Sequence, residues 1–140
     1  MKLDSEIEIR VTCGPQFARI CKQEKLEKLS GRNSGCMAGR GFGFISCHGD
    51  EQACGFLNIS GGNLIENGFD FGKIWMESEF LEEIRNLSAY KGNCGACEYV
   101  GLCRGCRARA YAMSGDYLAA DPICNYQNEK RRRHGLTLIR

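Results

Sequence analysis

Cysteine is the residue type whose number and spacing most clearly predict chemistry in this chain. The sequence holds ten cysteines, and five of them lie close together in its second half, at Cys94, Cys97, Cys103, Cys106 and Cys124. A thiolate is both a nucleophile and a soft metal ligand, so C-x-x-C pairs in a chain without secretory features usually indicate metal or redox chemistry. We therefore expect a metal centre in this region.

The spacing of these cysteines favours an iron–sulfur cluster over zinc. A zinc ribbon has two C-x2-C pairs about 15–20 residues apart, so that each pair occupies its own turn. Here only five residues separate Cys97 from Cys103, which suits a loop around a bulkier cluster that also takes one remote cysteine. Two alternatives stay open: a zinc-binding structural or interaction module, and a cysteine-rich structural fragment without metal.

Length and charge predict one compact domain with no strong electrostatic signal. The 140 residues include 19 Lys and Arg against 17 Asp and Glu, a net charge of +2, so nucleic-acid binding is not expected. The basic run at residues 130–133 is interpreted as a solvated tail. We expect a cytoplasmic protein without membrane contact, because acidic residues interrupt the first ten positions and no apolar run approaches about 18 residues.

The predicted elements that must position the thiols are short. Alternation predicts a strand at residues 6–12, and helical periodicity, begun by Pro15, predicts an amphipathic helix at residues 16–29. A β-hairpin is predicted from strands at residues 42–46 and 52–56 around a turn at residues 48–51, with another turn at residues 61–63. Helices are predicted at residues 67–86 and 107–113.

Several single residues have structural interpretations. Cys21 is expected on the buried face of its helix, Trp75 in core packing, and His48 in a solvated turn. Ser78 is a candidate N-cap for a second segment within the helix at residues 67–86. The apolar side of that helix is expected to support the cysteine-rich loop, which follows it directly.

The order of the cysteines resembles the SPASM domain, a C-terminal extension of many radical S-adenosylmethionine enzymes that holds auxiliary iron–sulfur clusters. The matching positions span residues 36–124 and comprise Cys36, Gly49, Cys54, the C94-x2-C97-x5-C103-x2-C106 run, and Cys124. One spacing differs, because the family has three residues where this chain has two between Cys103 and Cys106. The resemblance implies a small α+β cysteine-rich fold, with a hairpin and helices around an iron–sulfur site.

Longer phrases resemble the branch of this family that modifies tetrapyrroles in heme and heme d1 biosynthesis. They include G-R-G-F-G-F-I-S, Y-K-G-N-C-G-A-C-E-Y and C-R-A-R-A-Y-A-M-S-G-D-Y-L-A-A-D-P-I-C. That branch includes an iron-coproporphyrin decarboxylase and a didecarboxysirohaem deacetylase. Maturases of tungsten enzymes and of peptides are similar, and they remain an alternative.

The resemblance also implies roles for individual residues. Cys94, Cys97, Cys103 and Cys124 would bind one [4Fe–4S] cluster, and Cys36, Cys54 and Cys106 are candidates for a second, with Cys13 or Cys47 as its fourth ligand. Three arginines, Arg104, Arg107 and Arg109, lie where they could offset the negative charge of the first cluster and raise its reduction potential. Solvent-facing positions on a short helix are the alternative for each.

The catalytic part of such an enzyme is absent from these 140 residues, since they contain no C-x3-C-x2-C motif. We expect residues 1–30 to be a strand–helix remnant of the radical S-adenosylmethionine barrel, residues 31–127 the SPASM-like domain, and residues 128–140 a basic tail. The chain is then a fragment that is not active alone. A barrel, S-adenosylmethionine and a tetrapyrrole substrate would be its partners only in a complete enzyme.

Overall fold

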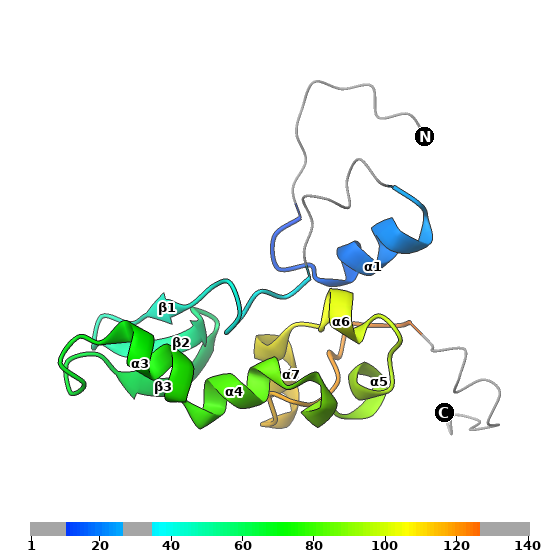
Figure 1. Ribbon diagram of the computed structural model, residues 1–140. Coiled ribbons are helices and arrows are strands. Elements are labelled where there is room, and N and C mark those ends of the chain that lie inside the picture. Colours follow the sequence, from blue (N-terminus) through cyan, green and yellow to red (C-terminus); the bar gives the residue numbers. More distant parts are fainter. Residues whose placement is uncertain (1–10, 27–34, 127–140) are drawn as a thin grey trace.

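The computed structural model describes residues 11–26 and 35–126. The strand predicted at residues 6–12 lies mostly outside this part, and its two described residues, Val11 and Thr12, are in no strand. The basic run at residues 130–133 also lies outside it. Within the described residues the architecture is α+β, as expected, with a small antiparallel sheet at one end and short helices at the other (Figure 1).

The sheet has three strands where the sequence predicted two. Strands β1 (Phe44–Ile45), β2 (Asp50–Cys54) and β3 (Leu57–Asn63) pair in the order β1-β2-β3. The predicted hairpin is present as β1 and β2, but Phe56 lies in the turn before β3. Phe44 pairs with Gln52, and Cys54 pairs with Leu57.

The turn predicted at residues 61–63 is wrong, because these residues form the end of β3. The glycines serve close packing there. A Cβ atom on Gly61 would lie 2.9 Å from the Ser78 hydroxyl oxygen, and one on Gly62 would lie 2.8 Å from Ile74. Glycine marks the close approach of a helix to a strand at this point, which sequence alone does not distinguish from a turn.

The long helix predicted at residues 67–86 is two helices, α3 (Phe71–Glu77) and α4 (Glu79–Arg85). Ser78 separates them as the N-cap of α4, because its hydroxyl accepts a hydrogen bond from the Leu81 N–H at 3.4 Å. The start is later than predicted, since Asp70 caps α3 by accepting from the Lys73 N–H at 2.9 Å. Helix α1 (Gln16–Gln23) begins after Pro15 as predicted, but ends sooner than expected.

The remaining helices are short and follow one another closely. They are the 3-10 turn η1 (Leu87–Ala89), α5 (Gly92–Gly95), α6 (Val100–Cys103) and α7 (Arg107–Ser114). Helix α7 matches the helix predicted at residues 107–113, and Gly115 ends it in the left-handed conformation, with φ of 72°. Helix α1 lies against α6 (Figure 1).

The core joins the sheet to α4. Ala53, Leu57, Leu81 and Ile84 are buried there, and Trp75 packs against them while stacking on the Phe71 ring. Cys21 is only 1% exposed, which confirms its predicted place in the interior, and His48 is exposed as predicted.

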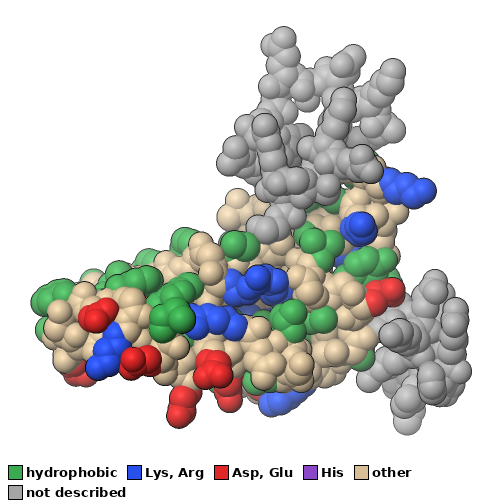
Figure 2. Space-filling view, in the orientation of Figure 1, with side chains coloured by type: hydrophobic (Ala, Val, Ile, Leu, Met, Phe, Trp, Pro, Cys, Tyr) green, Lys and Arg blue, Asp and Glu red, His purple; other side chains and the backbone are tan. Residues whose placement is uncertain are grey.

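Hydrophobic side chains also gather on the surface above the sheet (Figure 2). Among the described residues, no helix has the length and apolar character needed to cross a membrane.

Candidate metal centre

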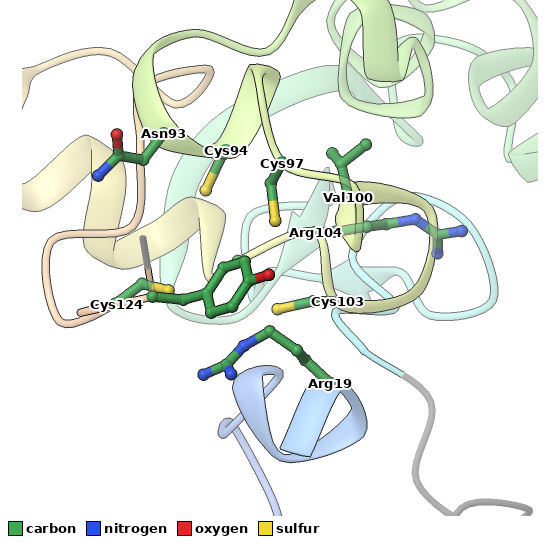
Figure 3. Close-up of a pocket in the computed structure, with 10 residues that line it drawn as sticks. Arg19, Asn93, Cys94, Cys97, Val100, Cys103, Arg104 and Cys124 are labelled. Carbon is green, nitrogen blue, oxygen red and sulfur yellow. The ribbon is translucent and has the colours of Figure 1, made fainter. Parts of the chain in front are cut away.

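Four of the five late cysteines border one pocket between α1, α5, α6 and the segment after α7 (Figure 3). They are Cys94, Cys97, Cys103 and Cys124, the set to which the resemblance assigned the first cluster. The Cys94 and Cys103 side chains are buried, whereas Cys97 and Cys124 are partly exposed. Arg19, Arg104 and Tyr126 complete much of the wall.

Short helices and a left-handed turn set the directions of these thiols. Helix α5 carries Cys94, and α6 ends at Cys103. After Cys103 the chain reverses through Arg104 and Gly105, whose φ angles are 65° and 59°. A Cβ on Gly105 would lie 3.0 Å from the Cys94 sulfur and 2.7 Å from the Arg107 guanidinium, so only glycine leaves space beside that sulfur.

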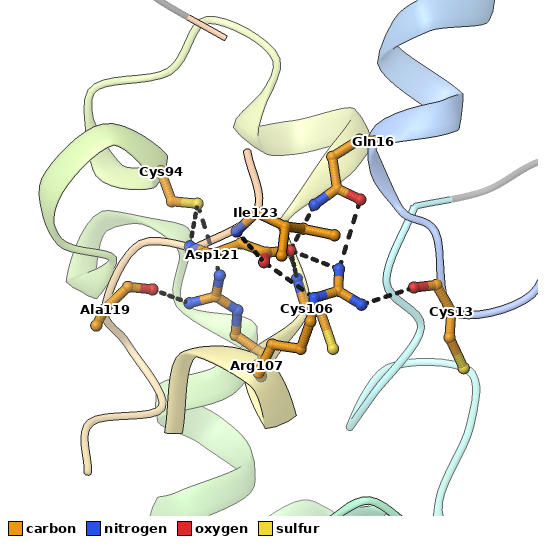
Figure 4. A network of polar contacts seen from close by, with 9 residues as sticks. Cys13, Gln16, Cys94, Cys106, Arg107, Ala119, Asp121 and Ile123 are labelled. Carbon is orange, nitrogen blue, oxygen red and sulfur yellow. Dashed lines mark hydrogen bonds and ion pairs between the residues drawn. The ribbon is translucent and has the colours of Figure 1, made fainter. Parts of the chain in front are cut away.

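Hydrogen-bond donors point at two of the sulfurs. The Cys94 sulfur accepts from the Asp121 N–H at 3.3 Å and from Nη2 of Arg107 at 3.6 Å (Figure 4). The Cys97 sulfur accepts from the Tyr99 N–H at 3.4 Å. Donors of this kind stabilise a metal-bound thiolate and raise the reduction potential of a cluster.

Arg107 brings a buried positive charge to this site. Its side chain is 1% exposed, and its Nη1 donates to the carbonyl oxygens of Tyr117 and Ala119 at 2.9 and 2.8 Å. The guanidinium carbon lies 4.4 Å from the centre of the Tyr90 ring. Its Nε has no hydrogen-bond partner, and no carboxylate in the described part of the chain forms an ion pair with it.

Arg19 brings a second cation from helix α1. It is 9% exposed, lines the same pocket and stacks over the Tyr126 ring, 4.6 Å from its centre. Its Nε also lacks a hydrogen-bond partner, and no ion pair with a described carboxylate involves it. Burying a cation without a counter-charge is costly. Two buried cations that pair with no carboxylate in residues 11–26 and 35–126, lying beside four thiols, therefore fit an anionic, thiolate-bound metal centre.

The three predicted arginines have different surroundings. Only Arg107 contacts a sulfur. Arg104 lines the pocket, but it donates to the carbonyl oxygens of Cys36 and Gly101 at 3.4 and 3.0 Å. Arg109 pairs with the buried Asp121 carboxylate. Sequence reasoning missed Arg19, because a single arginine on a helix far from the cysteine-rich loop gives no local signal.

A second set of thiols borders a larger cavity on the other side of the left-handed turn. Cys13, Cys36, Cys54 and Cys106 line this cavity, which has a volume of about 690 Å³. Cys36, Cys54 and Cys106 also pack against the core shared by the sheet and α4. Cys47, the other candidate for this set, lies elsewhere, exposed on the turn beside His48, with 3.4 Å between its sulfur and Nδ1 of that histidine.

Asp121 connects the two sets (Figure 4). Its N–H donates to the Cys94 sulfur of the first set, and its Oδ2 accepts from the Cys106 N–H of the second set at 2.7 Å. Arg109 and Gln16 also donate to this buried carboxylate, with 2.8 and 2.6 Å to Oδ2. Burial alone would raise the pKa of Asp121, but the Arg109 and Cys106 hydrogen bonds outweigh it and the pKa is lowered.

Burial favours the protonated form of four of these thiols. Burial raises the pKa of Cys103 to about 11, and it also raises the pKa values of Cys36, Cys54 and Cys97. Metal binding must therefore displace protons from these groups.

The first pocket is narrow, with a volume of about 20 Å³. Across residues 11–26 and 35–126, no group of three or more His, Cys, Asp or Glu side chains forms a site that could hold a metal ion. The four thiols border a shared hollow and do not converge on one point. The donor set and the buried cations fit a cluster, and the side chains around the hollow must move outward to admit one.

These features define a cysteine-rich α+β unit built around thiol sites, and comparison with known proteins relates the chain to AdoMet-dependent enzymes. No family model matches the chain. It is 38% identical, over 94% of its length, to the AdoMet-dependent heme synthase of Methanosarcina barkeri, and 32% identical, over 76%, to the Fe-coproporphyrin III synthase of the same organism. It is 29% identical, over 64%, to the PqqA peptide cyclase of Rhodopseudomonas palustris.

The chain corresponds to only a part of each relative. It covers 40% of the heme synthase, 28% of the Fe-coproporphyrin III synthase and 25% of the peptide cyclase. The chain is thus homologous to a portion of AdoMet-dependent heme synthases.

Proposed function

We propose that this chain is the C-terminal, cluster-binding part of an AdoMet-dependent enzyme of heme biosynthesis, similar to a SPASM domain. Cys94, Cys97, Cys103 and Cys124 would bind one [4Fe–4S] cluster. The observation that carries this proposal is the gathering of four thiols beside two buried guanidinium groups, Arg19 and Arg107, that form no ion pair with a described carboxylate. Similarity to heme synthases over almost the whole chain supports the biosynthetic role.

The bound cluster would accept or donate one electron. The residues of this chain would hold it and set its potential: the Asp121 N–H and Arg107 donate to the Cys94 sulfur, and the Tyr99 N–H donates to the Cys97 sulfur. Each donor offsets negative charge on a thiolate, which favours the reduced cluster. Protein groups thereby tune the electronics of a group that supplies the redox chemistry itself.

A second cluster at Cys36, Cys54 and Cys106 is also proposed. The shared cavity supports Cys13, and not Cys47, as the candidate for its fourth ligand. The turn at Arg104 and Gly105 separates Cys103 from Cys106, and so directs the two sulfurs to different cavities.

The complete enzyme would require a barrel that binds S-adenosylmethionine through a C-x3-C-x2-C motif, and it would act on a tetrapyrrole. We propose that the barrel is the partner of this chain, that the chain has no activity alone, and that the protein works in the cytoplasm. The barrel and the substrate rest on the resemblance and on the similarity to heme and Fe-coproporphyrin III synthases. The cytoplasmic location rests on the sequence pattern described above.

Anaerobic reconstitution tests the cluster assignment. The full chain is unfolded, reduced, and refolded with excess ferrous iron and sulfide in one sample and with zinc in another. The proposal predicts about four irons and four sulfides per chain for each cluster, with a broad visible absorption shoulder. Uptake of stoichiometric zinc without any iron would contradict it.

A second candidate is the corresponding part of a peptide-modifying enzyme, which the similarity to PqqA peptide cyclase favours. Lower identity and lower coverage make it the weaker candidate. The two candidates predict the same cluster chemistry and differ in the substrate.

A further inference from the structure

The cavity of the second thiol set is much larger than a metal site requires. Its volume of about 690 Å³ lies within the range of about 300–1,000 Å³ that is typical of small-molecule sites. The first thiol pocket, by contrast, has a volume of about 20 Å³. The larger cavity therefore has room for an organic ligand beside the sulfurs.

The wall of this cavity is apolar, and several of its side chains are unusually exposed. Phe42 is 51% exposed, Phe44 is 40% exposed and Phe56 is 79% exposed. Met37 and Val11 add further apolar surface at 39% and 41%. Exposed aromatic groups that converge on one hollow usually mark a surface that another molecule covers.

Local structure fixes the aromatic groups on one wall. Phe44 stands on β1, and Phe56 lies in the turn between β2 and β3. Gly55 permits the Phe44 ring to lie close to this turn, since a Cβ there would be 3.2 Å from the ring. The surface above the sheet in Figure 2 is correspondingly rich in hydrophobic side chains.

We propose that this cavity binds a tetrapyrrole, with the flat macrocycle against Phe42, Phe44 and Phe56 and close to the thiols of Cys36, Cys54 and Cys106. The proposal rests on the proposed function, since similarity to heme and Fe-coproporphyrin III synthases selects the tetrapyrrole among flat apolar ligands. It assigns substrate binding to this part of the enzyme, so the barrel is not the only part that holds substrate. The second thiol set would then lie beside the bound ring.

Metal-free coproporphyrin III is the probe for this site, because it has no iron that a thiol could ligate. The full chain is titrated with it anaerobically, before and after iron–sulfur reconstitution, and binding is followed by fluorescence anisotropy. Phe42→Ser and Phe56→Ser should each raise the Kd about tenfold, or about 1.4 kcal/mol. Phe69→Ser is the matched control, because Phe69 is 74% exposed but does not line the cavity.

The outcomes separate this inference from the cluster assignment. Porphyrin binding that falls in the Phe42 and Phe56 variants, with iron content unchanged, supports the site. Equal loss in the Phe69 variant, or no binding by the wild type, would overturn it while leaving the iron count as an independent result. Self-association of the chain that Phe56→Ser abolishes, without porphyrin binding, would also overturn it and assign the face to a protein interface.

Discussion

The two thiol sets of this molecule are built in opposite ways. In the first set, three of the four cysteines, Cys94, Cys97 and Cys103, come from one short loop, and only Cys124 is remote. In the second set, Cys13, Cys36, Cys54 and Cys106 come from four separate segments of the chain. Cys36, Cys54 and Cys106 pack against the core of the sheet and α4, whereas the Cys13 carbonyl oxygen accepts a hydrogen bond from Arg109 of α7. A local loop can gather ligands almost by itself, whereas a dispersed set depends on the whole fold.

The surroundings of the two sets also differ. The first pocket is small; the buried Arg19 lines it, and the buried Arg107 donates to the Cys94 sulfur at its edge. The second is wide, apolar and lined by exposed phenylalanines. This difference is the basis of the proposed division of work, in which the first set would hold a cluster and the cavity of the second set would bind the substrate.

The largest expected effect is the loss of iron when one thiol of either set is removed. Cys103→Ser should eliminate the cluster of the first set, about four irons per chain, and should leave porphyrin binding intact. Cys106→Ser should remove iron only from the second set. Iron and sulfide analysis measures both variants against Cys47→Ser, whose thiol lies in neither cavity. Equal iron in all three would show that the sets are not metal sites.

The next largest effect is expected on the free energy of unfolding when Asp121, which hydrogen-bonds to both thiol sets, is changed. Asp121→Asn breaks the ion pair with Arg109 at a fully buried carboxylate, which should lower the free energy of unfolding by about 3 kcal/mol. Asp116→Asn is the control, because its ion pair with Lys91 is exposed and should contribute less than about 1 kcal/mol. Urea unfolding of the metal-free chain measures both. Similar losses in the two variants would contradict a connecting role for Asp121.

The sequence predicted the local features well. The spacing indicated a metal centre in this region, and the SPASM resemblance assigned Cys94, Cys97, Cys103 and Cys124 to one site; the fold brings these four to one pocket. The cap at Ser78 and the helix α7 also follow from local patterns. Whether those cysteines bind a cluster stays a prediction.

The features that the sequence did not predict are tertiary. Strand β3 was missed because the paired glycines Gly61 and Gly62 have the composition of a turn, although α3 and α4 pack on them. Arg19 was missed because it reaches the first pocket only through the packing of α1 on α6. The place of Cys13 on the wall of the second cavity likewise depends on contacts between segments that are distant in the sequence.

Alanine substitutions at two glycines with positive φ, Gly105 and Gly115, test how tightly the turn between Cys103 and Cys106 is packed. Gly105→Ala should destabilise the chain by about 2 kcal/mol or more, because it adds a Cβ 2.7 Å from the Arg107 guanidinium to the conformational cost of a positive φ. Gly115→Ala has the same type of backbone but no atom within 4 Å of its Cβ, so about 1 kcal/mol is expected. Thermal unfolding compares them, and equal shifts in Tm would show that the turn tolerates a side chain.

The smallest expected effect is on the reduction potential of the first cluster, and it tests whether Arg107 acts through its charge. Arg107→Gln should lower the reduction potential of the cluster by about 60 mV, a tenfold change in a one-electron equilibrium, because it removes a buried cation near the Cys94 sulfur. Arg107→Lys should restore most of the potential. Spectroelectrochemical titration measures both variants. A potential that is unchanged in Arg107→Gln would show that this cation does not act on the cluster.

Iron-57 Mössbauer spectroscopy of a variant that keeps the first thiol set intact but lacks two of the four thiols of the second set is the most direct test of the central claim. The Cys36→Ser, Cys106→Ser double variant is reconstituted anaerobically, and its fold is checked by near-ultraviolet circular dichroism. The account predicts about four irons per chain in the spectrum of one [4Fe–4S] cluster. A folded variant that takes up no iron, or only mononuclear iron, would contradict it.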